Sequence, residues 1–247
     1  MGQHGKHRPL VILRAALALA VLLLPAPVLA CRLALVLAID ASASVDAREY
    51  LVQRNGLAAA LIAPEVQAAF LSDPEPVALA AFEWSGQWNQ HIMLDWRLIR
   101  SGEDLLEAAA EVSAAERKET RSPTAMGAAL GYAAGVLRDG PACTAQTIDV
   151  SGDGRNNHGY VPRLAYKHFP LDGVTVNALA IGGATELPGL VRYFETQVIK
   201  GPNAFVQEAR DYGDFERAMR RKLVREVGRA IAEGPPAMTA RSFQQRF

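Results

Sequence analysis

Short apolar runs alternate along the chain with longer segments in which apolar and polar positions mix. The clearest run covers residues 33–39, and a second covers 77–82. Unbroken apolar runs of this length are typical of strands that are buried on both faces of a parallel sheet. This pattern and the turn residues around it predict six strands, at 33–39, 77–84, 91–96, 147–151, 174–181 and 204–207.

The segments between these strands have helical spacing. The last is the most regular, because Phe215, Met219, Leu223 and Val227 recur four residues apart on one face. Helices are predicted at 46–63, 101–115, 123–137, 187–198 and from 212 onward. Strands that alternate with helices predict an α/β fold with a doubly wound, mostly parallel sheet. The short link at 85–87 predicts that the second and third strands form an antiparallel hairpin.

The first thirty residues have the pattern of an export signal. A basic start with Lys6 and Arg8 precedes an apolar run from about 10 to 24, and Val28-Leu29-Ala30 is a small-residue cleavage pattern. We expect cleavage after Ala30, one domain over residues 31–234 and a disordered tail over 235–247. A retained membrane anchor would need a longer uncharged span. We therefore expect a periplasmic or secreted protein with no membrane span.

Charge and motifs exclude several functions. The 26 basic side chains fall to 23 when Lys6, Arg8 and Arg14 leave with the signal, against 26 acidic ones. No basic run with interleaved aromatic residues occurs, so nucleic acid is not an expected partner. The sequence contains no phosphate-binding loop, dinucleotide fingerprint, nucleophile elbow or zinc-protease motif. An enzyme is therefore not predicted.

Two cysteines, Cys31 and Cys143, each lie just before a predicted parallel strand. If those strands are neighbours, the two thiols lie close enough for a disulfide, which an exported protein can keep. Lipidation of Cys31 is the alternative, because residues 28–31 loosely resemble a lipoprotein box. Two free thiols are the third possibility.

Oxygen-bearing side chains gather in three loops. Asp40, Ser42 and Ser44 follow the first strand, Thr124 begins a helix, and Asp153 follows the fourth strand. Loops at the carboxyl ends of parallel strands are where open α/β sheets bind ligands. Two carboxylates and three hydroxyls are hard oxygen donors, which Mg²⁺ or Mn²⁺ prefers. The competing interpretation is helix capping, since Asp, Ser and Thr are common caps.

These three loops resemble the metal-ion-dependent adhesion site of von Willebrand factor type A domains. The sequence Asp40-x-Ser42-x-Ser44 matches the first motif, Thr124 in Thr-x-x-Gly-x-Ala-Leu the second, and Asp153-Gly154 the third. Residues 148–154 and 201–205 also resemble a bacterial exported subfamily described as domain of unknown function 1194. Where many type A domains have a single Thr before the third-loop Asp, this chain has Ser151-Gly152. Asp149 therefore competes with Asp153 as the ligand, and strand placement favours Asp153.

The resemblance implies a strand order of 3-2-1-4-5-6 with strand 3 antiparallel and helices on both faces. It makes the first and fourth strands neighbours, as a Cys31–Cys143 disulfide requires. It implies a cation, Mg²⁺ before Mn²⁺ or Ca²⁺, held by Asp40, Ser42, Ser44, Thr124 and Asp153. It also implies a protein partner whose carboxylate completes the metal shell.

Three functions follow for this site. The first is a cation-dependent protein-binding module. The second is a metal-dependent hydrolase or phosphoryl-transfer enzyme that uses Asp40. Enzymes that form an aspartyl-phosphate generally have a second acid two residues later, where this chain has Ser42. They also need a basic residue near the site, for which Lys118 and Arg121 are the candidates. The third is a scaffold whose site stays empty.

Overall fold

The computed structural model describes residues 1–2, 31–118 and 121–232. The predicted export signal and the predicted disordered tail lie outside the described residues. No helix in the described part of the chain is long and apolar enough to span a bilayer.

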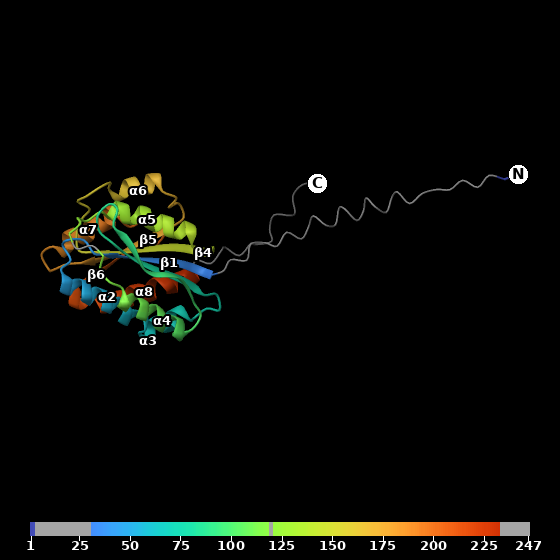
Figure 1. Ribbon diagram of the computed structural model, residues 1–247, viewed down its shortest axis with the longest axis horizontal. Helices are drawn as coiled ribbons and strands as arrows, with labels where there is room; N and C mark the ends of the chain where they lie inside the picture. The colour runs from blue at the N-terminus through green and yellow to red at the C-terminus, as the bar shows by residue number, and fades with distance from the viewer. Residues whose placement is uncertain (3–30, 119–120, 233–247) are drawn as a thin grey trace.

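One six-stranded sheet forms the centre of the molecule (Figure 1). Its order is β3-β2-β1-β4-β5-β6, with β2 and β3 antiparallel and the other neighbours parallel. The predicted α/β class, strand order and antiparallel hairpin are confirmed. The strands are β1 (Cys31–Asp40), β2 (Val77–Trp84), β3 (Gln90–Ile99), β4 (Cys143–Gly152), β5 (Thr175–Ile181) and β6 (Val206–Ala209).

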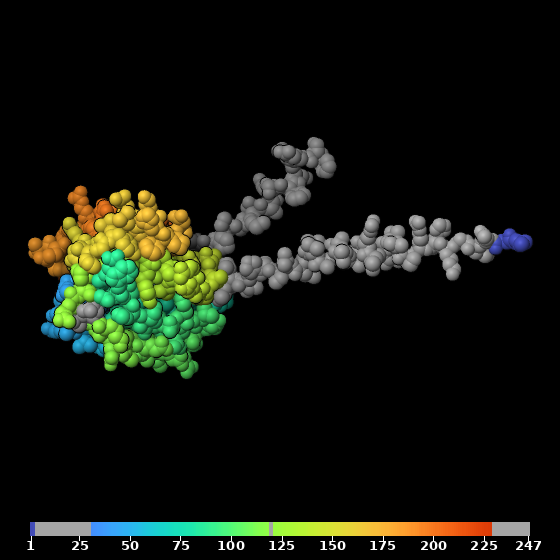
Figure 2. Space-filling model, turned by 45° about the horizontal axis from the view of Figure 1, so that its top comes forward, coloured from blue at the N-terminus to red at the C-terminus, as the bar shows by residue number. Residues whose placement is uncertain are grey.

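Helices cover both faces of the sheet, as Figure 1 shows. One layer contains α2 (Ala47–Leu61), α3 (Pro64–Phe70), α4 (Gly102–Ala114) and α8 (Phe215–Ala232). The other contains α5 (Met126–Asp139), α6 (Pro162–His168) and α7 (Leu187–Gln197). In the space-filling view, α6 lies along the upper edge in yellow and α4 along the lower edge in green (Figure 2). A short 3-10 turn, η1 (Tyr212–Asp214), precedes α8.

Strand β1 is the centre of both hydrophobic cores. All ten of its residues are buried. Because side chains alternate along a strand, Leu33, Leu35, Leu37 and Ile39 pack under α2 and α8, while Ala34, Val36 and Ala38 pack against the α5 layer. This explains why the run at 33–39 has no polar alternation.

The structure differs from the predicted elements at several ends; β4, for example, begins at Cys143 and not at residue 147. The first helix ends at Leu61, and α3 begins at Pro64, where a proline suits the first turn of a new helix. Helix α6 was not predicted, because seven residues give too little periodicity to recognise. Strand β6 covers Val206–Ala209 and not 204–207, and the turn before it contains Asn203, whose φ is 54°.

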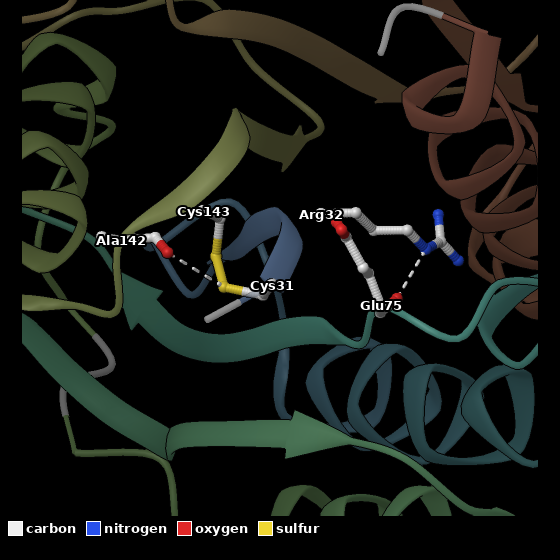
Figure 3. Close-up of a disulfide and its surroundings, with 5 residues drawn as sticks. All are labelled: Cys31, Arg32, Glu75, Ala142 and Cys143. Carbon is white, nitrogen blue, oxygen red and sulfur yellow. Dashed lines mark hydrogen bonds between the residues drawn. A yellow bond between two sulfur atoms is a disulfide. The ribbon is translucent and has the colours of Figure 1, made fainter. Parts of the chain in front are cut away.

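A disulfide joins Cys31 to Cys143 at the amino-terminal ends of β1 and β4 (Figure 3). The two residues are register partners, and their Cα atoms are 4.6 Å apart. The predicted pairing is confirmed. The disulfide uses the Cys31 sulfur, which would have to be free for lipidation.

Arg32, next to the disulfide, is the main polar anchor at this end of β1. It is 5% exposed, and its guanidinium donates to four carbonyl oxygens, those of Glu75, Ala69, Phe70 and Val227. The bond to Glu75 is drawn in Figure 3. Because these carbonyls lie at the end of α3, before β2 and in α8, Arg32 fixes three segments around the start of β1. Burial lowers the pKa of the guanidinium.

Candidate metal centre

The three oxygen-bearing loops meet at the carboxyl-terminal edge of the sheet. Asp40 ends β1, and Asp153 directly follows β4. Since β1 and β4 are parallel neighbours with Ile39 opposite Ser151, both loops leave the sheet at the same place. Thr124 arrives from the segment before α5 on one face of the sheet.

Hydrogen bonds link the five residues into one cluster. Ser44 Oγ donates to Asp153 Oδ1 at 2.7 Å, and the Oγ atoms of Ser42 and Ser44 lie 3.1 Å apart. Thr124 Oγ1 donates to Ser42 Oγ at 3.2 Å. The backbone N–H of Ser42 donates to Asp40 Oδ1 at 2.8 Å. The structure therefore brings together every residue of the predicted ligand set.

Asp40 is the most constrained member of the cluster. It is fully buried, and its Oδ2 has no hydrogen-bond partner among the described residues. Burial, followed by the nearby charge of Asp153, raises the pKa of this carboxyl to about 7. A buried, unpaired carboxylate oxygen costs free energy that a bound cation would offset. The residues present therefore fit a divalent cation.

Gly152 makes room for this carboxylate. A Cβ atom at position 152 would lie 2.9 Å from Asp40 Oδ2. That distance is closer than such atoms approach without a shift. The glycine before Asp153 thus allows β4 to end beside Asp40, and the replacement of the usual Thr by Ser151-Gly152 is compatible with the site.

Helix capping does not account for these hydroxyls. Helix α2 is capped by Asp46, whose carboxylate accepts from Glu49 N while the Glu49 side chain accepts from Asp46 N. Helix α5 begins after Ala125 with no side-chain cap. Thr124 is 3% exposed and directs its hydroxyl to Ser42. The capping interpretation is wrong for Ser42, Ser44 and Thr124.

Asp149 lies away from the cluster. It is 1% exposed and forms an ion pair with Lys222 Nζ at 2.8 Å, on the sheet face beneath α8. Of the two competing carboxylates, only Asp153 lies with the oxygen cluster. His91, His158 and His168 are all exposed.

A shell of supporting contacts holds the loops in place. Tyr212 Oη donates to Asp153 Oδ2 at 3.0 Å, and the Asn157 side chain accepts from Thr124 N at 2.9 Å. Gln53 donates to the Asp40 carbonyl at 2.8 Å. The Arg117 guanidinium donates to the carbonyls of Ala41 and Ser42, both at 2.9 Å. The sequence pattern did not single out Tyr212, Gln53 or Arg117, since no short motif connects them to the loops.

An acidic cavity of about 540 Å³ adjoins the cluster and shares Asp153 with it. Its other carboxylates are those of Asp46, Glu49, Glu186 and Asp211, against one cation, Arg48. Within the described part of the chain, none of these carboxylates forms an ion pair. The surface beside the oxygen cluster is therefore negative.

The proposed metal ligands include more hydroxyl groups than carboxylates. The residues that the structure describes contain no group of three or more His, Cys, Asp or Glu side chains that could hold a metal ion. The cluster at the sheet edge instead has two carboxylates and three neutral hydroxyls. Hydroxyl and carboxylate oxygens bind hard cations such as Mg²⁺ or Mn²⁺ better than they bind soft metals that prefer thiolates.

Solved structures share this fold. Proximal thread matrix protein 1 from the mussel byssus, in a structure with a zinc-occupied MIDAS motif (metal-ion-dependent adhesion site), is 15% identical with a TM-score of 0.56 over 81% of this chain and 48% of its own. The von Willebrand factor type A protein from Catenulispora acidiphila is 17% identical, with a TM-score of 0.51 over 81% of this chain and 43% of its own. The PilB minor pilin from Streptococcus sanguinis is 12% identical, with a TM-score of 0.58 over 85% of this chain and 65% of its own.

These likenesses establish the fold and not the function. The chain spans about half the length of the byssus chains that it matches, 49% and 48%. Among curated proteins, none matches the sequence. One family model, described as protein of unknown function (DUF1194), matches residues 30–231. The chain belongs to this family, and its fold is that of a von Willebrand factor type A domain.

Proposed function

We propose that the protein is an exported binding module that holds a divalent cation and through it binds an acidic group on a partner protein. The observation that carries the proposal is the convergence of five oxygen-bearing side chains around the buried, unpartnered Oδ2 of Asp40. The zinc-occupied motif in the byssus protein of the same fold supports a divalent cation. The hard donor set favours Mg²⁺ over Zn²⁺ here.

Each residue has a distinct part in this proposal. Asp40 and Asp153 would supply two negative charges, which balance a divalent cation, and Ser42, Ser44 and Thr124 would supply neutral oxygens. The bound cation would provide a positive centre for a partner's carboxylate. Asp40, Ser42 and Thr124 are buried, whereas Ser44 is exposed and Asp153 is partly exposed. The partner would therefore approach from the side of Ser44 and Asp153.

We propose binding and not turnover for this site. Ser42 stands where a phosphoryl-transfer enzyme would use a second acid. Lys118 has a side chain that is 54% exposed and pairs with Glu116. The Arg117 guanidinium is engaged with backbone carbonyls of the first loop. These contacts give Lys118 and Arg117 structural partners, which supports binding over turnover at this site.

The acidic cavity suggests the chemistry of the partner. A carboxylate that reaches the cation must cross a surface with the charges of Asp46, Glu49, Glu186 and Asp211. Basic side chains on both sides of the partner's acidic residue would compensate for this repulsion. An exported location agrees with the Cys31–Cys143 disulfide, because disulfides persist in oxidising compartments.

A metal titration tests the proposal. MgCl₂ is added to the signal-free protein, and the unfolding midpoint is followed for the wild type, for Asp153→Asn and for Asp172→Asn. Asp172 is a fully exposed acid that pairs with Lys200 and serves as the matched control. A bound ion raises the midpoint, so the wild type and Asp172→Asn should respond equally and Asp153→Asn much less.

Two results would contradict the proposal. No shift in the wild type with Mg²⁺ or Mn²⁺ would leave the scaffold with an empty site as the better account. A shift accompanied by hydrolysis of p-nitrophenyl phosphate or p-nitrophenyl acetate, lost in Asp40→Asn, would favour the enzyme.

A further inference from the structure

A groove beside the acidic cavity lies between α2 and the segment that begins α8. Its volume is about 430 Å³, and it shares Arg48, Val52, Tyr212 and Gly213 with the acidic cavity. The two hollows are therefore continuous. The remaining residues that line this α2–α8 groove are Leu51, Asn55, Gly56, Ala59 and Glu216.

The α2–α8 groove differs from the acidic cavity in its chemistry. Two adjacent aliphatic side chains of α2 are exposed in it, Leu51 by 46% and Val52 by 37%. Its one acid, Glu216, forms an ion pair with Arg220. Apart from Arg48 at the boundary, the groove therefore offers an apolar surface with little free charge.

Tyr212 connects this groove to the proposed metal site. It lines both hollows, and its Oη donates to Asp153 Oδ2 at 3.0 Å. Asp153 is the member of the proposed metal set that lines the acidic cavity. A partner segment that reaches the cation can therefore continue through the acidic cavity into the groove.

The groove is preformed by the packing of its walls. A Cβ atom at Gly56 would lie 3.0 Å from Phe215 Cδ1, so this glycine allows α8 to start close against α2. Along α2, Glu49 in the acidic cavity and Ala59 in the groove are about 15 Å apart. This is the length of about four or five residues of extended chain. The continuous hollow is thus long enough for two side chains of one segment.

We propose that the α2–α8 groove binds an apolar side chain of the same partner whose acidic residue reaches the cation, an inference that rests on the proposed function. In order along the surface, the partner segment presents an acidic residue to the cation, a basic residue to the acidic cavity and an apolar residue to Leu51 and Val52. The carboxylates of the cavity favour the basic residue. Removal of exposed aliphatic surface from water favours the apolar one.

A second copy of this chain is the competing occupant of the groove. A two-fold interface places the same surface of both copies in contact. Around this groove, such an interface would bring two acidic cavities close together, and like charges in contact disfavour association. A partner with a basic residue beside its apolar one avoids this repulsion.

Peptide selection on the signal-free protein tests the proposal. Random peptides with one fixed Asp are displayed, bound to the immobilised protein in MgCl₂ and eluted with EDTA. The wild type should enrich Lys or Arg near the Asp and, farther out on the same side, Leu, Ile, Met or Phe. The Leu51→Ser, Val52→Ser double variant should keep the basic preference and lose the apolar one. It should bind the peptides selected on the wild type about fivefold or more weakly.

Two controls locate the effect. The double variant changes only exposed side chains, so its rise in unfolding midpoint with MgCl₂ should equal that of the wild type. Leu106→Ser, at a 58% exposed leucine on α4 that lines neither hollow, should select the same peptides as the wild type.

Three results would overturn the inference. Mg²⁺-dependent peptides without an apolar preference, or with one that the double variant retains, would leave the proposed function intact and remove only the role of the groove. Selection of no Mg²⁺-dependent peptide would overturn the proposed partner binding and this inference together. A wild-type dimer in analytical ultracentrifugation that the double variant converts to a monomer would assign the groove to a second copy of the chain.

Discussion

Ser44 Oγ donates a 2.7 Å hydrogen bond to Asp153 Oδ1 across 109 residues of sequence. The contact joins the loop after β1 to the loop after β4, and both residues belong to the proposed metal set. In the absence of a cation, such hydroxyls partly satisfy the carboxylates that would otherwise repel one another. A cation would compete for the same oxygens, which makes the stability of the loops depend on the metal.

Asp40→Asn should have opposite effects in the two conditions. In chelator, the variant should be more stable than the wild type by on the order of 1 kcal/mol, because it removes a buried charge next to Asp153. In saturating Mg²⁺, it should be the less stable of the two, because it has lost a charged ligand. Denaturant unfolding in EDTA and in MgCl₂ measures both values. If the variant is destabilised equally in both conditions, Asp40 has only a structural role.

Thr124 offers a test with matched substitutions. Thr124→Val keeps the shape of this buried side chain and removes the hydroxyl, whereas Thr124→Ser keeps the hydroxyl and removes a methyl group. We expect Thr124→Val to weaken Mg²⁺ binding about tenfold, since one lost ligand hydrogen bond or contact costs on the order of 1 kcal/mol. Calorimetric titration measures the affinity. Thr124→Ser should stay within about threefold of the wild type, and the reverse order would exclude the hydroxyl as a ligand.

The disulfide should stabilise the fold without affecting the metal site. The Cys31→Ser, Cys143→Ser double variant releases a bridge across 112 residues, which the chain-entropy account values at about 4–5 kcal/mol. Its unfolding free energy should fall by an amount of that order. Cys31 and Asp40 are at opposite ends of β1, roughly 30 Å apart, so the Mg²⁺ affinity measured below the unfolding transition should not change. A large loss of affinity would mean that β1 transmits the change along its length.

The α/β class and the five oxygen-bearing residues could be anticipated because local sequence marks them, whereas the strand order was implied only by the family resemblance. The run at 33–39 is apolar throughout since β1 has helices on both faces, and Asp40 marks the residue at which the strand leaves the core. The supporting residues could not be anticipated in the same way. Tyr212 reaches Asp153 only because η1 lies beside the loop after β4, and nothing in the local sequence specifies that contact.

Helix α8 also contains side chains whose burial could not be predicted from the local sequence. Phe215, Met219, Leu223 and Val227 were predicted to share a face, and all four are buried. Lys222 and Glu226 are buried next to that row, although their polarity alone would place them in solvent. Their burial depends on Asp149 and Asn177, which lie on the sheet face opposite and come from distant parts of the chain.

This buried cluster should give the protein a measurable pH dependence. Burial first, and then the charge of Asp149, raise the pKa of Glu226 from 4.5 to about 7, while Lys222 opposes the shift. A raised carboxyl pKa contributes stability that is complete below pH 4.5 and is lost as the pH rises through about 7. The wild type should therefore lose on the order of 1–3 kcal/mol relative to Glu226→Gln between pH 5 and 8, in EDTA. A difference that stays constant over this range would show that Glu226 is ionised throughout.

Partner binding should depend on the acidic cavity next to the metal set. Glu186 is exposed and lines this cavity, and no hydrogen bond or ion pair occupies its side chain among the described contacts. Peptides with one Asp flanked by lysines should bind the Mg²⁺-loaded protein more tightly than peptides with the same Asp flanked by glutamates, and the difference should shrink at high salt.

Glu186→Gln should reduce this preference about twofold or more while the Mg²⁺ affinity is unchanged. Glu195 is an exposed acid on α7 outside the cavity, so Glu195→Gln should leave the preference unchanged. Fluorescence anisotropy of labelled peptides measures both effects. Equal binding of the two peptides at low salt would mean that the acidic cavity takes no part in choosing the partner, even if the cation site itself is real.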